Sequence, residues 1–422
     1  MKYIVVLGDG MADWPLEQLG GKTPLQAAAK PHIDALAKSA EVGLCRTVPA
    51  GFKPGSDVAN LSVMGYDPHA CYTGRSPLEA VSIGIDLKDT DVTLRCNLVT
   101  LSDEEKYEDK TMIDYSAGEI STAEARELVE FLKKHFDGER CRLYAGVSYR
   151  HCLVVSDGQT GHELTPPHDI SGRPIKTFLP KGPMGEFYLD MMKRSARLLQ
   201  DHPVNRARIA AGKRPANSVW FWGEGTKPAL ENFSEKFGKR GGVISAVDLV
   251  KGIGILAGMR IIEVPGATGN YDTNFAGKAD AALGALLGGL DFVYIHMEAP
   301  DECGHQGDVA HKIYSIEQID QKVVARLCEG LYAAGERFRM LICPDHPTPI
   351  AVRTHVSDPV PYLLYDSGAA LNGAAGGATA ATGGATAATG GATAAAYDED
   401  SAKQTGVFIE NGFTLMKKLF AE

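Results

Sequence analysis

Short apolar runs alternate along this chain with segments whose apolar residues recur at helical spacing. The runs at residues 3–7, 291–297 and 339–343 are mainly apolar, and they are followed by glycine, glutamate and proline respectively. A run of this kind is typical of a strand in a parallel sheet that is buried on both faces. Residues 31–40 and 122–136 instead place apolar side chains every three or four positions, as amphipathic helices do. The alternation predicts an α/β fold with a doubly wound, mostly parallel sheet.

The same patterns predict the remaining elements. A capping box, with Ser121 as the N-cap and Glu124 three residues later, opens the helix that ends at residue 136. Further strands are predicted at residues 42–48, 91–100, 141–145, 152–156, 219–223, 260–264 and 359–365. Further helices are predicted at residues 58–64, 185–200, 248–258, 275–287, 309–331 and 413–420.

The length of 422 residues exceeds the usual size of one domain, so we expect two. The charged loop at residues 102–110 is the predicted boundary. We expect a core made of residues 1–108 and 241–422, with a smaller α/β domain inserted at 109–240. Residues 373–396 contain only Ala, Gly and Thr in a repeated seven-residue unit, and they are predicted to form a loop without function.

Acidic and imidazole side chains follow the three apolar runs. In an open α/β sheet, ligands bind where the carboxyl ends of the strands emerge, so these side chains would meet at one edge. Aspartate and histidine without paired cysteines favour Mn, Zn or Mg, and the donors suffice for two ions that clamp a phosphoryl group. The alternative is that each Asp merely caps a helix and each His is structural. The predicted ligands are Asp9, Asp301, His305, Asp345 and His346, with His355 as an additional one.

Ser56 is the candidate nucleophile. It follows Pro54-Gly55 and precedes Asp57, so it is predicted to be the N-cap of the helix at residues 58–64. A hydroxyl at a helix start can meet an anion held by free backbone N–H groups, and a metal could hold it as the alkoxide. Two alternatives remain open: Ser56 only caps the helix, or Ser62 is the nucleophile.

Basic residues between residues 75 and 214 are candidate contacts for a phosphate or a carboxylate. Arg75, the pair Arg150 and His151, and His168 with Asp169 lie in predicted loops. The segment 201–217 is basic in an otherwise acidic chain. For each of these, an ordinary solvated surface is an equally good interpretation.

Composition excludes several classes of protein. The net charge of -10 argues against a nucleic-acid-binding protein, which normally carries a basic face. We expect no membrane span, because no apolar run approaches about 18–20 residues. The apolar run near the first residue is too short for the core of a signal peptide. The eight cysteines form no CxxC pair, so we expect reduced thiols and a cytoplasmic protein.

Taken together, several motifs make the chain resemble a known family. It is similar over nearly its whole length to the archaeal-type cofactor-independent phosphoglycerate mutases, which belong to the alkaline phosphatase superfamily. Asn60 stands where the larger bacterial and plant mutases carry a histidine, which fits the archaeal-type branch. The motifs are Gly8-Asp9-Gly10, Gly55-Ser56-Asp57-Val58-Ala59-Asn60-Leu61, Gly65-Tyr66-Asp67-Pro68, Trp222-Gly223-Glu224-Gly225, Ala299-Pro300-Asp301 with Gly304-His305, and Asp345-His346.

The resemblance implies a role for each matching residue. It implies an alkaline-phosphatase-like core with a mobile cap, and interconversion of 3-phosphoglycerate and 2-phosphoglycerate through a phosphoserine at Ser56. It implies two divalent ions, with Mn²⁺ expected first and Mg²⁺, Co²⁺ or Zn²⁺ as alternatives. One ion would be held by Asp9, Ser56, Asp345 and His346, and the other by Asp301, His305 and His355. The implied substrate contacts are Arg150, His151 and Asp169, then Arg208 and Lys312 on a looser local match.

Three functions compete at this stage. The first is the mutase, with His151 expected to take part in proton transfer and a small phosphorylated hydroxy acid as its partner. The second is another phosphotransfer on the same metals, such as a phosphatase or a homoserine kinase. The third is a metal-binding module without activity. The absence of a Walker-type glycine-rich loop means that a kinase would have to use ATP through the same two metals.

Overall fold

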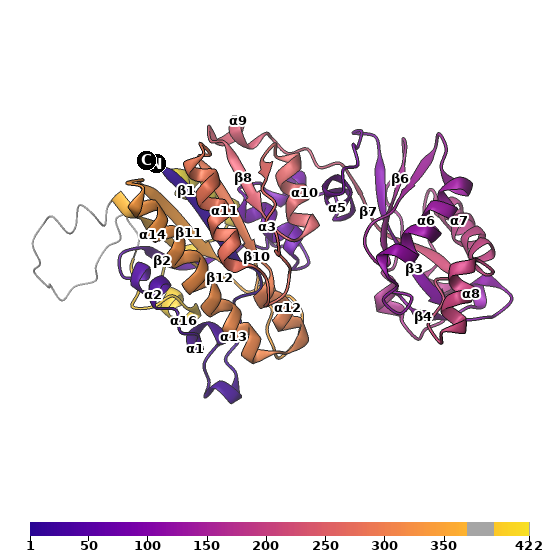
Figure 1. Ribbon diagram of the computed structural model, residues 1–422, viewed down its shortest axis with the longest axis horizontal. Coiled ribbons are helices and arrows are strands. Elements are labelled where there is room, and N and C mark those ends of the chain that lie inside the picture. The colour runs from indigo at the N-terminus through magenta and orange to yellow at the C-terminus, as the bar shows by residue number, and fades with distance from the viewer. Residues whose placement is uncertain (369–391, 422) are drawn as a thin grey trace, which may run out of the picture. The chain divides into compact units, whose positions relative to one another are not determined.

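The chain folds into two compact units, drawn in Figure 1. The computed structural model describes residues 1–368 and 392–421. The first unit consists of Met1–Tyr72 and Ala229–Glu422, and the second consists of Thr73–Pro228.

The first unit is built on an eight-stranded sheet with the strand order β13-β2-β12-β11-β1-β10-β8-β9. The central strand β1 pairs in parallel with β10 on one side and with β11 on the other, while β12 runs antiparallel to both its neighbours. The predicted α/β fold with a mostly parallel sheet is therefore confirmed. The strands are β1 (Lys2–Gly8), β2 (Glu41–Cys45), β8 (Gly241–Ile244), β9 (Arg260–Ile261), β10 (Phe292–Met297), β11 (Phe338–Cys343), β12 (Val360–Asp366) and β13 (Phe408–Ile409).

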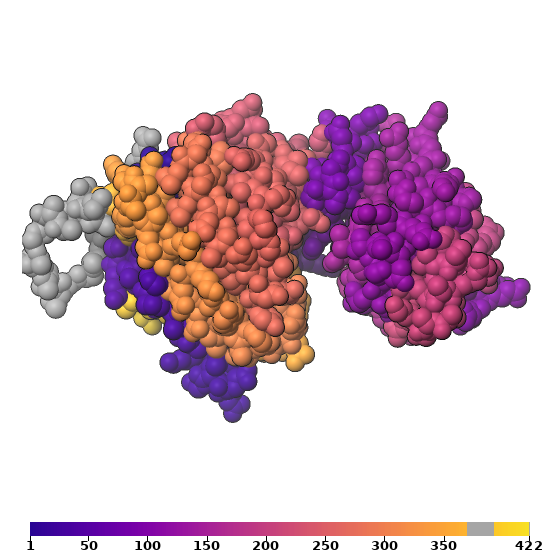
Figure 2. Space-filling view, in the orientation of Figure 1, coloured from indigo at the N-terminus to yellow at the C-terminus, as the bar shows by residue number. Residues whose placement is uncertain are grey.

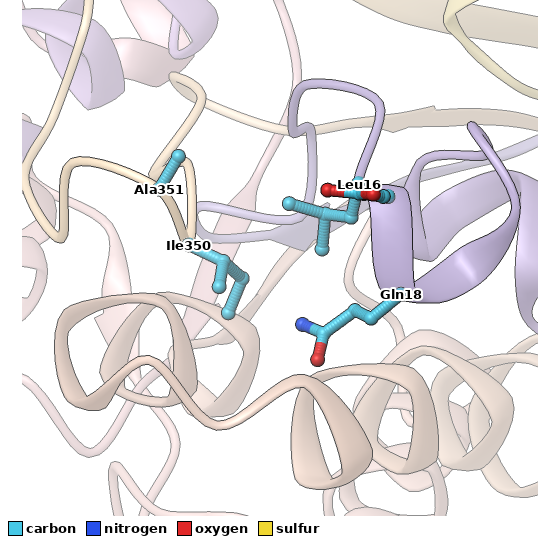
Figure 3. Close-up of a pocket in the computed structure, with 5 residues that line it drawn as sticks. Leu16, Gln18, Ile350 and Ala351 are labelled. Carbon is cyan, nitrogen blue, oxygen red and sulfur yellow. The ribbon is translucent and has the colours of Figure 1, made fainter.

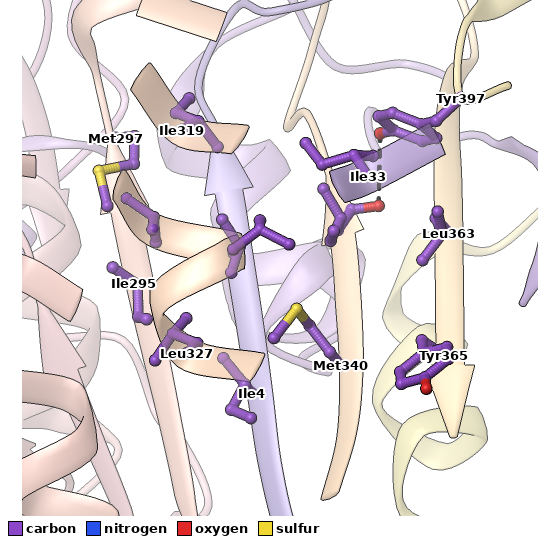
Figure 4. Packing of buried hydrophobic residues seen from close by; sticks show 14 of the residues in the cluster. Ile4, Ile33, Ile295, Met297, Ile319, Leu327, Met340, Leu363, Tyr365 and Tyr397 are labelled. Carbon is purple, nitrogen blue, oxygen red and sulfur yellow. Dashed lines mark hydrogen bonds between the residues drawn. The ribbon is translucent and has the colours of Figure 1, made fainter. Parts of the chain in front are cut away.

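Helices cover both faces of this sheet, because alternate residues of each buried strand point to opposite faces. On one face, Ile4 and Ile295 pack with Leu327 in the main core (Figure 4). On the other, the ring of Phe420 lies against Tyr3 and Phe292. Figure 2 shows the first of these helical layers from outside, in orange and salmon. The α-helices of the unit are α1 (Pro24–Ala27), α2 (Pro31–Ala37), α3 (Ser56–Val63), α4 (Pro68–Cys71), α9 (Phe233–Phe237), α10 (Asp248–Leu256), α11 (Phe275–Leu287), α12 (Ala299–Gln306), α13 (Val309–Gln318), α14 (Ala325–Ala333), α16 (Glu399–Gln404) and α17 (Leu415–Phe420).

The predicted single helix at residues 309–331 is interrupted by a π-helical segment, η5 (Ile319–Val324), between α13 and α14. The wider turn points the buried carboxylate of Asp320 at the start of α2, where it accepts hydrogen bonds from the backbone N–H groups of His32 and Ile33. Helix α2 has no side-chain N-cap of its own. The carboxylate therefore satisfies free donors at the positive end of a helix.

The second unit contains an antiparallel sheet in the order β4-β3-β6-β5, with β7 paired to the other edge of β3. Helix α6 begins with the predicted capping box of Ser121 and Glu124. The motif at residues 222–225 is structural here, since Glu224 accepts hydrogen bonds from the backbone of Gly161 and His162. The elements are β3 (Val92–Leu101), β4 (Met112–Asp114), β5 (Cys141–Tyr144), β6 (Arg150–Val155), β7 (Ser218–Thr226), α5 (Ser76–Ser82), α6 (Thr122–Phe136), α7 (Gly185–Leu199) and α8 (Pro203–Ala210).

Short 3-10 turns complete the two units. They are η1 (Glu17–Leu19) and η6 (Gly412–Thr414) in the first unit, and η2 (Tyr107–Asp109), η3 (Pro167–Ile170) and η4 (Lys176–Phe178) in the second.

The limits of the second unit differ from the expected 109 and 240. Strand β3, which we assigned to the core, pairs with β6 and β7 and so belongs to the second unit. The charged loop at residues 102–110 connects β3 to β4 within that sheet and is not a boundary. The chain instead passes between the units at Tyr72–Thr73 and Pro228–Ala229, where it carries no run of charge.

Most of the Ala/Gly/Thr segment, residues 373–391, lies outside the described residues. Its last residues contact the first unit, where Ala392 accepts a hydrogen bond from the N–H of Val42 and Ala394 donates one to Ala37. Among residues 1–368 and 392–421, no helix is both long and apolar enough to cross a membrane.

The carboxyl of Glu399 makes the stability of the first unit depend on pH. It accepts hydrogen bonds from the N–H of Asp13 and the hydroxyl of Thr23, and burial raises its pKa to about 7. The folded chain therefore keeps this proton where the unfolded chain loses it, so the contribution is complete below about pH 4.5 and is lost as the pH rises through 7.

We expect Glu399→Gln to remove this dependence of stability on pH, because the amide has no titrating proton. Its oxygen can still accept from the N–H of Asp13, while its NH₂ group can donate to the hydroxyl oxygen of Thr23. Thermal unfolding of the metal-free protein between pH 5 and 8 measures it. A stability profile that falls equally in both proteins over this range would contradict the assignment.

Candidate metal centre and nucleophile

The carboxyl ends of β1, β10 and β11 bring three aspartates to one edge of the sheet. Asp9 directly follows β1, Asp345 lies two residues after β11, and Asp301 lies in the first turn of α12, just beyond β10. All three are buried. The predicted convergence therefore has its origin in the parallel pairing of β1 with both neighbours.

Asp9 is a buried carboxylate that lacks a full set of partners. Its Oδ2 lies 2.9 Å from Nε2 of His296 on β10, whereas its Oδ1 has no hydrogen-bond partner among the described residues. Burial and the negative charges of Asp345 and Asp301 raise the pKa of Asp9 well above its ordinary range. A cation bound here would give Asp9 Oδ1 a partner and would offset the repulsion between the carboxylates.

Asp345 and His346 are held from several sides. Asp345 Oδ1 accepts from the N–H groups of Gly10 and His346, and its Oδ2 accepts from Nδ2 of Asn60 at 2.9 Å. The Nε2 atom of His346 lies 3.4 Å from Asp345 Oδ2 and 3.7 Å from Asp9 Oδ1. Two carboxylates and one imidazole thus face a common point.

The hydroxyl of Ser56 reaches the same point. Its Oγ lies 3.1 Å from Nε2 of His346. We expected Ser56 to be the N-cap of α3, but Gly55 is the N-cap and Ser56 is the first residue of the helix. The hydroxyl is therefore not used to cap the helix and is available to a ligand.

A second group lies beside the first. The Nε2 atoms of His305 and His355 are 2.9 Å apart, and they lie 3.3 Å and 3.4 Å from the two carboxylate oxygens of Asp301. His305 and Asp301 are four residues apart on α12, which puts them on one face of the helix. Although burial opposes it, hydrogen bonds from both imidazoles hold the pKa of Asp301 well below its usual range, and Asp301 raises the pKa of His305 to about 9.

These residues fit divalent cations. Ligand atoms of Asp9, Asp345 and His346 all lie within 4.8 Å of one another, as do those of Asp301, His346 and His355. The donors are carboxylate oxygens and imidazole nitrogens, the set that suits Mn²⁺, Zn²⁺ or Mg²⁺. Every expected ligand thus lies in one of two adjoining groups, and His346 borders both.

Three residues of this centre were not predicted. His296 contacts Asp9 from within β10, Asn60 of α3 fixes Asp345, and Thr348 contacts both Asp301 and His346. The one available signal was His296, a polar residue within a buried apolar strand. Asn60 was noted only as part of a family motif.

The predicted substrate contacts lie in the second unit, except for Lys312. His151 is buried, and its Nδ1 accepts a hydrogen bond from the N–H of Gly146 at 3.1 Å, while its Nε2 has no partner among the described residues. Burial lowers the pKa of His151 to about 3, so the ring is neutral and its Nε2 carries the proton. Arg150 and Asp169 are exposed, and Arg75 is 2.7 Å from Glu79.

Arg208 and Lys312 have internal partners instead. The guanidinium of Arg208 donates to Glu124 and to the backbone carbonyls of Ala117 and Arg214. The ammonium of Lys312 is fully buried, lies 2.7 Å from Asp13 and donates to the carbonyl of Thr348. Each set of contacts favours a role in holding the fold, and Lys312 in particular ties the loop after β11 to the loop after β1.

Lys312→Met tests that role. Removing one partner of a buried ion pair leaves an uncompensated charge, so we expect the free energy of unfolding to fall by about 3–5 kcal/mol. Urea unfolding of the metal-free protein measures the change, with Lys322→Met at an exposed position as the control, expected within about 0.5 kcal/mol. Unchanged stability with a raised KM would instead assign Lys312 to the substrate.

A shallow pocket lies beside the loop after β11. It has a volume of about 480 Å³ and is lined by Leu16, Glu17, Gln18, Ile350 and Ala351 (Figure 3). None of these residues belongs to the predicted site, and the pocket offers no imidazole to a metal. It is therefore separate from the groups described above.

Comparison with known proteins agrees with the motifs. Residues 37–205 match the family model described as 2,3-bisphosphoglycerate-independent phosphoglycerate mutase. The chain is 50% identical over 419 residues, 99% of both chains, to a probable 2,3-bisphosphoglycerate-independent phosphoglycerate mutase of Geobacter sulfurreducens. It is 49% identical over 421 residues, all of both chains, to the 2,3-bisphosphoglycerate-independent phosphoglycerate mutase of Methanothrix thermoacetophila.

Solved structures give the same result. A protein from Pyrococcus horikoshii aligns with a TM-score of 0.77 and 27% identity, covering 100% of this chain and 98% of the other. The cofactor-independent phosphoglycerate mutase of Thermoplasma acidophilum aligns with a TM-score of 0.63 and 25% identity over all of both chains. The resemblance drawn from the motifs is thus confirmed, and the chain belongs to the family of 2,3-bisphosphoglycerate-independent phosphoglycerate mutases.

Proposed function

We propose that this chain interconverts 3-phosphoglycerate and 2-phosphoglycerate through a phosphoserine formed on Ser56. The observation that carries the proposal is the position of the Ser56 hydroxyl, 3.1 Å from His346 Nε2, at a point that Asp9 and Asp345 also face. The relatives at 49–50% identity over the full length are named as mutases, which favours this activity over other phosphotransfers.

The core residues would bind two divalent cations, and we propose Mn²⁺. One would be held by Asp9, Ser56, Asp345 and His346, and the other by Asp301, His305 and His355. Such cations supply charge that stabilises the transferring phosphoryl group and lower the pKa of a bound hydroxyl.

The residues of the chain prepare the attack. Gly55 caps α3, so Ser56 presents its Oγ from the first turn of the helix, where free N–H groups and the helix dipole favour an anion. Asn60 donates to Asp345 while its Oδ1 accepts from Tyr294, so the carboxylate cannot turn away from the site. His305 must lose its proton to bind a cation, so metal uptake should release protons.

We propose that His151 binds the substrate and does not take part in the proton transfer that we first expected of it. As a neutral ring that already accepts at Nδ1, it can donate a hydrogen bond from Nε2 to an oxygen of the substrate. We propose that Arg150 binds an anionic group of the same substrate and that Asp169 binds a hydroxyl. The substrate class is a small phosphorylated hydroxy acid.

The eight free cysteines fit a reducing compartment, and we propose the cytoplasm.

A product assay tests the proposed activity. The purified protein, loaded with Mn²⁺, is incubated with 3-phosphoglycerate and followed by ³¹P NMR. We expect 2-phosphoglycerate to form without ATP and without accumulation of free phosphate. Release of free phosphate from 3-phosphoglycerate would show that the protein is a phosphatase. If ATP is supplied, formation of ADP only in the presence of homoserine would show that it is a homoserine kinase.

A further inference from the structure

Thr348 lies where three of the sequence motifs meet. It follows Asp345-His346 in the loop after β11 and is fully buried. A side-chain carbon added at Gly10 would lie 2.6 Å from Thr348 Oγ1, and one added at Gly304 would lie 2.5 Å from the Thr348 carbonyl oxygen. The two glycines of the other motifs therefore allow the loops to close around this one residue.

The backbone of Thr348 is fixed on both sides. Its N–H donates to the carbonyl of Ala12 at 3.3 Å, and its carbonyl accepts from the buried ammonium of Lys312 at 2.8 Å. A β-branched side chain on a fixed backbone has few rotamers available. The hydroxyl is therefore held in one place.

That hydroxyl contacts one residue from each group of predicted ligands. Thr348 Oγ1 donates its proton to Asp301 Oδ1, because an ionised carboxylate can only accept. The same oxygen lies 3.3 Å from Nδ1 of His346 and must accept there, so Nδ1 carries a proton. The lone pair of the neutral ring is then on Nε2, the atom that faces Ser56, Asp9 and Asp345.

We propose that Thr348 is a positioning residue that couples the two cation sites through its single hydroxyl. It orients the Asp301 carboxylate of one site and selects the metal-binding tautomer of His346 in the other. This inference rests on the proposed two-metal centre. Groups that orient metal ligands in this way typically change metal affinity by about 10–100-fold when they are removed.

The test compares Thr348→Val with Thr348→Ser by calorimetric titration of the metal-free protein with Mn²⁺. Valine keeps the shape and loses the hydroxyl, so we expect both dissociation constants to rise by about 10–100-fold. Serine keeps the hydroxyl, so we expect values within a few-fold of wild type. The control is Thr47→Val, because Thr47 is equally buried but its hydroxyl has no partner among the described residues; its affinities should not change.

A metal-free thermal unfolding curve accompanies each titration, because a purely structural role would lower stability without changing affinity. If Thr348→Val weakens Mn²⁺ binding at only one site, or at neither, the proposed coupling between the two sites is wrong, although the two-metal centre stands. The coupling is equally wrong if Thr348→Ser behaves like the valine variant. A wild-type protein that binds no Mn²⁺, or one ion, removes the proposed centre itself and this inference with it.

Discussion

Replacing Ser56 by alanine is expected to reduce mutase activity by about four orders of magnitude or more, because removal of a nucleophile removes the covalent route entirely. The hydroxyl lies 3.1 Å from His346 and makes no cap contact with its own helix, so its loss should leave α3 intact. The steady-state rate with 3-phosphoglycerate measures the effect. Calorimetry should still show two Mn²⁺ ions, since aspartate and histidine ligands remain at both sites.

The matched control is Ser62→Ala. Ser62 lies about 1.7 turns further along α3. It is fully buried, and its hydroxyl has no partner among the described residues. We expect activity within about a factor of two of wild type, because no hydrogen bond is lost. Full activity of Ser56→Ala, combined with loss in Ser62→Ala, would transfer the role to Ser62.

Replacing Asp9 by asparagine is expected to act in opposite directions on function and on stability. The carboxylate is buried beside Asp345 with one oxygen unpartnered, so the metal-free protein should unfold at an equal or higher temperature once that charge is removed. The same change removes a metal ligand, so activity should fall by more than about 100-fold, beyond the cost typical of an outer-shell group. Thermal unfolding with and without Mn²⁺ measures both effects.

Mn²⁺ should raise the unfolding temperature of the wild-type protein, because it binds only the folded state. It should raise the unfolding temperature of Asp9→Asn much less. Asp91→Asn is the matched control, because Asp91 is also buried with one unpartnered oxygen but belongs to the second unit. Its response to Mn²⁺ should equal that of wild type. Asp9→Asn with lowered metal-free stability and a normal response to Mn²⁺ would rule out the ligand role.

The sequence could predict the central sheet because its strands are buried on both faces and therefore read as apolar runs. Strands β1, β10 and β11 were expected within one or two residues, and their parallel pairing explains why Asp9, Asp301 and Asp345 meet. The limits of the second unit could not be predicted in this way. The pairing of β3 with β6 and β7 joins residues more than fifty positions apart, and local composition does not record such contacts.

The side chains that hold the ligands were the hardest part of the site to predict. His296 is the second-last residue of the buried strand β10, and the pattern of that strand does not show that the ring faces Asp9. Arg208 and Lys312 were implied as substrate contacts by the family resemblance, on a looser local match, and the sequence does not show that each of these charges meets an internal partner. The N-cap of α3 lies one residue earlier than expected, at Gly55 instead of Ser56, which is within the usual variation of helix ends, yet this shift frees the Ser56 hydroxyl.

Anomalous X-ray scattering from crystals grown with Mn²⁺ tests the two-metal centre most directly. We predict two anomalous peaks at the end of β1, one within bonding distance of Asp9, Asp345, His346 and the Ser56 hydroxyl, and the other within bonding distance of Asp301, His305 and His355. A single peak, or two peaks that leave Ser56 outside bonding distance of either ion, would contradict the account.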